Sequence, residues 1–178
     1  ADQTNGLFEL RPFFWKYNKR INAYGDLFVM NHIKKRQEYL FKKVSSYLPI
    51  IKSNIIKSRF SLGKNNEKII FKTIKATHGK TNSLIYIFEN TAYISDCNDL
   101  TIIKRDVLKN LKYLIIDCLR LEKHPSHFNL NDCIYVHHHL KPKKTILTNL
   151  HYTLDYNYLL KKLPDDMVPA FDGLRINL

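Results

Sequence analysis

The sequence predicts an α/β layered domain with mixed sheets, and three observations support this prediction. Apolar strand-like segments alternate with helical segments in the C-terminal half, as they do in layered α/β folds. Segments of alternating polarity near the middle are separated by short turns, which predicts antiparallel hairpins. A length of 178 residues with 44% hydrophobic residues suits one globular domain with its own core. We therefore expect residues 1–178 to form a single domain.

The first third of the chain predicts one strand and one helix. Residues 20–24 read as a short strand that ends at a Gly-Asp turn. Asn31 is suited to cap a helix from about residue 32 to 47, where apolar residues recur at helical spacing. Pro49 stops that helix. Residues 50–62 remain open, because their pattern fits neither a helix nor a strand clearly.

The middle of the chain predicts a strand, a hairpin and a helix. Residues 69–74 alternate in polarity and run into Thr77-His78-Gly79. Two further strands, 83–88 and 91–95, flank the turn residues Glu89-Asn90. A helix is expected at 102–110.

The C-terminal half predicts two buried strands that alternate with two helices, followed by a final hairpin. Continuous apolar residues ended by an acid are typical of a buried strand. The first of the two helices begins at Asn129, and Pro142 closes it. The strands are expected at 113–117 and 145–147, the helices at 129–140 and 155–163, and the hairpin at 168–170 and 174–177.

The net charge and the cysteine content bear on the partner and the cellular compartment of the protein. The formal net charge of +13 fits a polyanionic partner such as a nucleic acid or a phosphate ester. The basic residues are scattered and Lys, Asn and Ile are abundant throughout, which favours compositional drift over a nucleic-acid site. Three cysteines without paired spacing are typical of a reduced, cytoplasmic protein. No apolar run is long enough to cross a membrane, so no membrane association is expected.

Polar side chains follow several of the predicted strands, and strand ends in such folds gather on one rim. Imidazole nitrogens and carboxylate oxygens suit Zn²⁺ or Mn²⁺. Any one of these residues alone fits a loop or a strand cap equally well, but their joint placement favours a metal site. The rim candidates are Asp2, His78, Asp96, Asp117, His124, His127, Asn149 and His151.

Other histidines do not fit this pattern. His137, His138 and His139 are adjacent in a predicted helix, so they point to different sides of it. A solvated helix end is the better interpretation there. His32 has no supporting context and is treated in the same way.

Several motifs follow one another in order along the chain. They are Thr77-His78-Gly79, Tyr93-Ile94-Ser95-Asp96, Leu114-Ile115-Ile116-Asp117-Cys118-Leu119-Arg120, His124-Pro125-Ser126-His127-Phe128-Asn129-Leu130, Leu147-Thr148-Asn149-Leu150-His151, Leu154-Asp155-Tyr156 and Pro169-Ala170-Phe171-Asp172-Gly173-Leu174-Arg175-Ile176. Their order resembles that of the bacterial metallo-β-lactamase-fold hydrolases, close to the phosphonate-pathway cyclic phosphodiesterases and more distantly ribonuclease Z. The resemblance covers nearly the whole chain. It implies a four-layer αββα sandwich, here lacking its N-terminal strands.

The resemblance implies two divalent metal ions that share an aspartate. The family's first ligands come from an H-x-H-x-D-H loop. Asp2 matches the aspartate of that loop, with a catalytic as well as a ligand role, and Gln3 stands where its last histidine often is. The two leading histidines would lie before Ala1. His78 resembles a ligand of the first metal, and Asp96 resembles the bridging aspartate.

The remaining site residues follow from the same resemblance. His127 resembles the histidine that contacts the phosphate and protonates the leaving group. His124, close by, is expected to support substrate binding. Asn149 occupies the last ligand position, where a histidine is common. His151, two residues later, could replace it, because residues two apart on an extended segment share a face.

The resemblance implies metal-dependent hydrolysis of a small cyclic or nucleotide-like phosphodiester. With the leading histidines absent, we expect one divalent cation or none, held weakly. The chain as given is then either inactive or a piece of a longer active product, and both remain open. Two other functions remain as alternatives: a degenerate phosphate- or nucleotide-binding module without catalysis, and a tRNA 3′-processing nuclease like ribonuclease Z. A homodimer is also left open.

Overall fold

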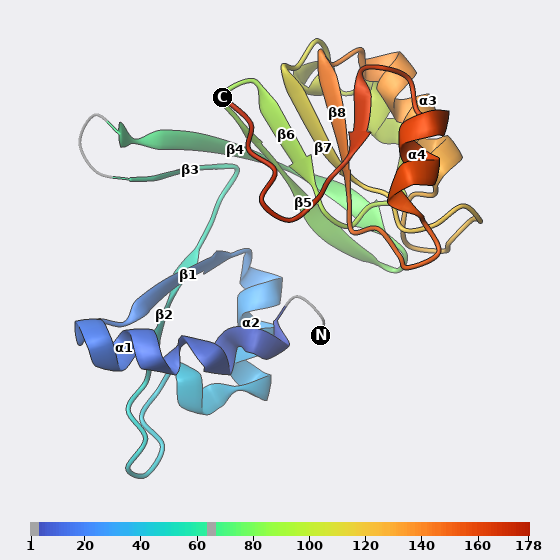
Figure 1. Cartoon of the computed structure of the whole chain (residues 1–178). Helices are drawn as coiled ribbons and strands as arrows, with labels where there is room; N and C mark the ends of the chain where they lie inside the picture. The colour runs from blue at the N-terminus through green and yellow to red at the C-terminus, as the bar shows by residue number, and fades with distance from the viewer. Residues whose placement is uncertain (1–3, 64–66) are drawn as a thin grey trace. The chain divides into compact units, whose positions relative to one another are not determined.

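The computed structural model of the protein describes residues 4–63 and 67–178, which form two compact units, Ala1–Lys57 and Ser58–Leu178 (Figure 1). Each unit has its own hydrophobic core. Within these described residues, no helix combines the length and the apolar character needed to cross a bilayer.

The first unit combines two parallel strands with short helices. Its small core is formed by Leu40, Ile50 and Ile51, with partly buried apolar residues packed around them. The elements are 3₁₀ helix η1 (Asn5–Leu10), α1 (Arg11–Tyr17), β1 (Ile21–Gly25), α2 (Leu27–Arg36), 3₁₀ helix η2 (Glu38–Leu40) and β2 (Ile51–Ile55), with β1 parallel to β2. Strand β1 confirms the strand expected at 20–24.

The predicted helix of this unit is displaced in the structure. Helix α2 is capped by Asp26, whose carboxylate accepts a hydrogen bond from the Val29 amide at 2.8 Å, rather than by Asn31. It ends at Arg36, because the chain then turns to bury Leu40 and to hold its carbonyl oxygen against the Ile50 amide. Tertiary packing thus overrides the helical pattern of residues 37–47.

The second unit is a seven-stranded mixed sheet in the order β3-β4-β5-β6-β7-β8-β9. Strands β3 to β6 pair antiparallel, and β6 to β9 pair parallel. This confirms the mixed α/β class. The strands are β3 (Arg59–Leu62), β4 (Ile69–His78), β5 (Thr81–Phe88), β6 (Thr91–Ile94), β7 (Tyr113–Asp117), β8 (Lys144–Thr148) and β9 (Met167–Pro169).

The hairpin around Glu89-Asn90 is confirmed. Both residues adopt positive φ angles, 43° and 55°, which is the conformation that a two-residue hairpin turn of type I′ requires. Helices α3 (Leu130–Leu140) and α4 (Tyr156–Lys162) also form where they were predicted. Helix α3 packs on β7 and α4 on β9 (Figure 1).

Two predictions for this unit are wrong. In place of a helix at 102–110 the structure has two 3₁₀ helices, η4 (Leu100–Lys104) and η5 (Asp106–Leu108), separated by the extended residue Arg105. Ile102 and Leu108, six residues apart, would point about 120° apart on an α-helix. The break at Arg105 lets both side chains reach the core, where they are fully buried.

The expected final hairpin does not form. Only β9 (Met167–Pro169) is a strand, and it pairs parallel with β8 instead of with residues 174–177. Pro169 has no amide hydrogen, which suits the edge position of β9 in the sheet.

His137 also departs from the expectation of a solvated helix end. It is only 4% exposed, because it lies on the face of α3 that packs against the sheet. Its Nδ1 lies 2.9 Å from the Thr145 hydroxyl, and its Nε2 lies 3.2 Å from a carboxylate oxygen of Asp166. His138 and His139 remain exposed.

Burial lowers the pKa of His137 below its ordinary value, although Asp166 opposes this shift. The unfolded chain therefore takes up a proton more readily than the folded chain as pH falls below about 6.5. We expect the free energy of unfolding to fall over that range. Urea denaturation at pH 8 and at pH 5.5 checks this, and His137→Gln should reduce the difference between the two pH values. His138→Gln, on the exposed side of the same helix, should leave the difference unchanged.

Candidate functional site

Three side chains that could share a metal ion meet at one end of the large sheet. His78, Asp96 and His127 each offer one donor atom, and these atoms all lie within 4.8 Å of one another. All three residues are partly buried. Among the described residues this is the only group of three or more His, Cys, Asp or Glu side chains that satisfies these distances.

Strand direction explains why residues so far apart in the sequence meet here. Strand β4 is antiparallel to β5, and β5 is antiparallel to β6, so β4 points the same way as β6, β7 and β8. His78 ends β4, Asp96 follows β6, and Asp117 ends β7. His127 lies in the loop between β7 and α3. The predicted gathering of strand-end residues on one rim is therefore present in the structure.

His78 is oriented by the loop that carries His127. Its Nδ1 lies 2.7 Å from the carbonyl oxygen of Ser126, which can only accept, so Nδ1 carries the proton. Nε2 then keeps its lone pair for a metal, and a backbone carbonyl on the other ring nitrogen is a common partner of metal-binding histidine.

Gly79 allows the close approach of these two segments. Its φ angle is 58°, and a Cβ added to it would lie 3.0 Å from the Cβ of Ser126. The Gly79 amide donates to Asn98 Oδ1 at 3.0 Å, and Asn98 Nδ2 donates to the Pro125 carbonyl at 2.9 Å. Asn98 thus connects the turn after His78 to the Pro125-Ser126 segment.

Asp117 holds His127 in place. Its carboxylate is fully buried, with Oδ2 accepting from His127 Nδ1 at 2.6 Å and Oδ1 accepting from Asn149 Nδ2 at 3.0 Å. Burial raises the pKa of the Asp117 carboxyl, while the hydrogen bonds from His127 and Asn149 oppose the rise. The sequence placed Asp117 on the rim but did not assign it a role. An acid at the end of a fully buried strand is the signal that could have identified it, because a buried carboxylate needs partners.

His124 lies beside His127, outside the cluster of donor atoms. The two rings have centroids 5.1 Å apart, and His124 Nδ1 accepts from the Ser126 amide at 3.3 Å. Burial, followed by the neighbouring His127 and Arg120, lowers the pKa of His124. A neutral ring next to His127 is consistent with a supporting role, and its contact with substrate stays a prediction.

His151 is not part of the three-residue group, and the amide of Asn149 donates to Asp117. Asn149 has a φ angle of 57°, so the segment is not extended, and the geometric premise for exchanging it with His151 is wrong. The His151 ring stacks on Tyr152, with centroids 4.2 Å apart, and its Nδ1 lies 3.0 Å from the Thr153 hydroxyl. Their roles as ligands stay predictions. Asp2 and Gln3 lie outside the described residues.

None of the cysteines belongs to the three-residue cluster. Cys97, Cys118 and Cys133 are buried and unpaired in disulfides. Burial raises the pKa of the Cys97 thiol to about 12. The donors that the cluster offers are therefore imidazole and carboxylate groups.

Comparisons with known proteins agree with this geometry. A family model described as a beta-lactamase superfamily domain matches residues 1–152. Among curated proteins, the chain is 25% identical over 177 residues to an octanoyltransferase of Porphyromonas gingivalis, covering 97% of this chain and 35% of that protein. The chain thus spans about a third of that relative's length.

Solved structures share the fold. A diphosphatase from the PhnP family has a TM-score of 0.79 and 23% identity, over 96% of this chain and 64% of that chain. The metallo-β-lactamase-fold protein YhfI from Bacillus subtilis has a TM-score of 0.63 and 15% identity, over 86% of this chain and 63% of that chain. The short form of human tRNase Z has a TM-score of 0.56 and 13% identity, over 89% of this chain and 67% of that chain. The chain covers under two thirds of the first of these structures.

Proposed function

This chain belongs to the beta-lactamase superfamily, whose members are mostly hydrolases, and from that premise we propose that it acts as a metal-dependent hydrolase on a small cyclic or nucleotide-like phosphodiester. The observation that carries the proposal is the meeting of His78, Asp96 and His127 at the strand ends, with donor atoms within 4.8 Å. The positive net charge of +13 is consistent with an anionic substrate.

The donor set fits a divalent cation such as Zn²⁺ or Mn²⁺. His78 offers a neutral nitrogen that is oriented by Ser126, and Asp96 offers an anionic oxygen. We propose that these two residues hold the cation, together with Asp2 and with weaker contributions from Gln3, Asn149 or His151. A cation bound there would supply Lewis acidity, which lowers the pKa of water and neutralises charge on a phosphodiester.

His127 is better suited to the substrate than to the cation. Its nitrogen nearest to Asp96 is Nδ1, at 3.8 Å, and that nitrogen already donates to Asp117. A nitrogen that carries a proton has no lone pair for a metal. Asp117 fixes the orientation of the ring, as a buried aspartate does for the histidine of a catalytic triad. We propose that His127 Nε2 contacts the phosphate and gives its proton to the leaving oxygen.

Titration of Mn²⁺ or Zn²⁺ into the 178-residue chain by calorimetry tests the cation site. We expect at most one equivalent, bound weakly, and we expect His78→Ala to remove it because the neutral nitrogen is lost. His32→Ala is the matched control, since His32 is exposed in the other unit. Two tightly bound equivalents, or unchanged binding in His78→Ala, would contradict the assignment. Cation-dependent hydrolysis of an aryl phosphodiester by the whole protein then tests the reaction.

Phosphate binding without catalysis is the second candidate function. It is favoured by Asn149, whose amide is committed to Asp117 at a position where the resemblance expects a metal-binding histidine. A module of this kind would bind inorganic phosphate in a cation-dependent manner and give no turnover of phosphodiesters. Turnover that is lost on chelation excludes it.

A further inference from the structure

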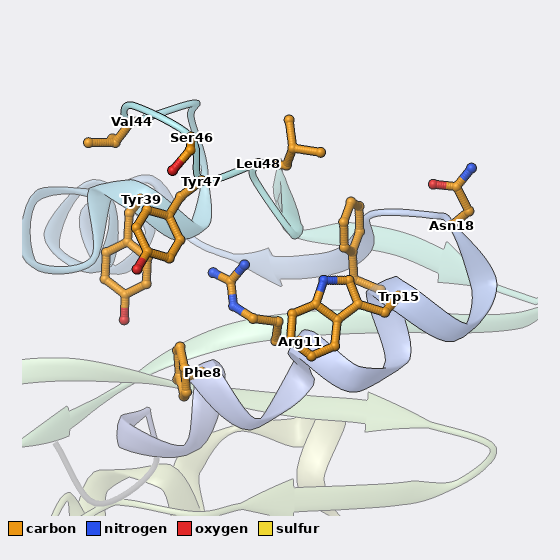
Figure 2. A pocket seen from close by; sticks show the side chains of 10 residues that line it. Phe8, Arg11, Trp15, Asn18, Tyr39, Val44, Ser46, Tyr47 and Leu48 are labelled. Carbon is orange, nitrogen blue, oxygen red and sulfur yellow. The ribbon is translucent and has the colours of Figure 1, made fainter.

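An aromatic pocket lies in the first unit, and its lining contains none of the residues of the proposed metal site. It has a volume of about 1090 Å³ and lies between the η1–α1 segment and residues 39–48 (Figure 2). Five aromatic side chains line it: Phe8, Phe14, Trp15, Tyr39 and Tyr47. Pockets of this size and composition are typical of small-molecule sites, which combine apolar walls with a few polar groups.

The charged group in this pocket is the guanidinium of Arg11. The residue is only 8% exposed, and its Nε and Nη2 have no hydrogen-bond partner among the described residues. Figure 2 shows the side chain reaching between Phe8 and Tyr47, whose ring centroids lie 5.5 and 5.7 Å from its central carbon. Aromatic faces attract a cation but do not satisfy its N–H donors. Within the part of the chain that the structure describes, Arg11 is therefore a buried charge with two unused donors.

The local sequence explains why Arg11 takes this position. Arg11 begins α1, and Pro12 follows it at the first turn, where a proline fits a helix without loss of a hydrogen bond. Because the side chain of a helix-starting residue lies over the preceding segment, the guanidinium lies beside Phe8 of η1. The backbone therefore fixes the guanidinium inside the pocket.

Two adjacent donors on one edge of a guanidinium match the two oxygens of a carboxylate in a bidentate pair. One buried cation balances one negative charge. The first unit also has eleven Lys and Arg against three Asp and Glu between residues 4 and 57, which favours an anionic ligand. The aromatic walls favour an apolar or aromatic body attached to the anionic group.

We propose that this pocket binds an organic monoanion, a carboxylate attached to an aromatic body. Arg11 would donate hydrogen bonds to the carboxylate. A buried and unpaired charge destabilises a fold, so its presence is explained when a ligand satisfies it. The pocket is a different site from the proposed metal site, because none of its lining residues is a proposed metal ligand.

Trp15 makes binding directly measurable, because it lines the pocket and is the only tryptophan of the chain. The probes are 3-phenylpropionate and its neutral counterpart 3-phenylpropan-1-ol, titrated into the 178-residue chain. We expect saturable changes in tryptophan fluorescence with the acid and affinity for the alcohol about 10- to 100-fold weaker, the range expected when a charge-assisted pair is lost. Equal affinity for the two probes, or no saturable change with either, overturns the proposal.

Arg11→Met keeps the length and the apolar stem of the side chain and removes the charge. We expect it to lose the preference for the acid, while Arg36→Met, an exposed position in the same unit, keeps it. We also expect Arg11→Met to melt at a higher temperature than the ligand-free wild type, because an unpaired buried charge is gone. 3-Phenylpropionate should then raise the melting temperature of the wild type and leave that of Arg11→Met unchanged. A variant that still prefers the acid refutes the role of Arg11.

Discussion

Replacing Asp96 with alanine in the whole protein is expected to lower cation-dependent hydrolysis by a factor on the order of 10³, since Lewis-acid stabilisation is worth several kcal/mol and roughly 1.4 kcal/mol is a factor of ten. Asp96 is the only carboxylate in the three-residue cluster of the described chain. Removing it takes away an anionic ligand proposed beside His78, and a divalent cation is held poorly when an anionic ligand is lost. Turnover and bound metal should be lost together.

Two variants separate this effect from a loss of folding. Asp96→Asn keeps the shape of the side chain and removes its charge, so it should lose metal while its urea denaturation midpoint stays close to that of the wild type. Asp106→Ala removes an exposed acid from the same connection between β6 and β7, where it pairs only with Lys109. That control should keep full activity. Near-normal turnover with full metal content in Asp96→Ala would remove Asp96 from the site.

Local sequence signals predicted those elements whose stability depends on their own residues. Two segments of alternating polarity flank the polar pair Glu89-Asn90, so the hairpin could be predicted from the local pattern. Asn129 both caps α3 and takes part in a capping box with Asp132, so the start of α3 could be predicted as well. The continuous apolar run of β7 gave its bounds.

Elements fixed by distant contacts could not be predicted in the same way. The break at Arg105 exists because Ile102 and Leu108 both reach the core, and no local pattern carries that requirement. His137 was expected to be solvated because it has two histidine neighbours, yet Thr145 and Asp166, from other parts of the chain, give it polar partners in a buried position.

In the candidate site, too, local sequence signals predicted some features, while contacts between distant residues determine the others. His78, Asp96 and His127 were chosen because each follows or lies near a predicted strand, and parallel strand directions bring such residues together. The pairing of Asp117 with His127 and Asn149 depends on which side chains face each other across β7 and β8, which single-sequence patterns do not specify. The aromatic pocket around Arg11 was missed for a related reason, because its walls come from two segments separated by more than twenty residues.

Replacement of His127 distinguishes a role in catalysis from a role in metal binding. In the whole protein, His127→Ala is expected to lower turnover of phosphodiesters by about 10²–10⁴, the usual worth of a positioned general acid, while metal content stays unchanged. The physical reason is the hydrogen bond from Nδ1 to the buried carboxylate of Asp117 at 2.6 Å, which occupies that nitrogen and leaves Nε2 to exchange a proton. Steady-state kinetics together with elemental analysis of the purified variant measure both quantities.

The leaving group and a neighbouring histidine supply the controls. A substrate with a nitrophenolate leaving group needs no proton, so the loss caused by His127→Ala should be much smaller there than with an alkoxide leaving group. His124→Ala removes an imidazole from the same loop, whose ring centroid lies 5.1 Å from that of His127, and should have the smaller effect on both substrates. If His127→Ala loses metal in proportion to its loss of activity, and if activity falls equally with both leaving groups, His127 is a ligand of the cation. Its bond to Asp117 would then orient a metal-binding ring, as carboxylates do for many metal-binding histidines.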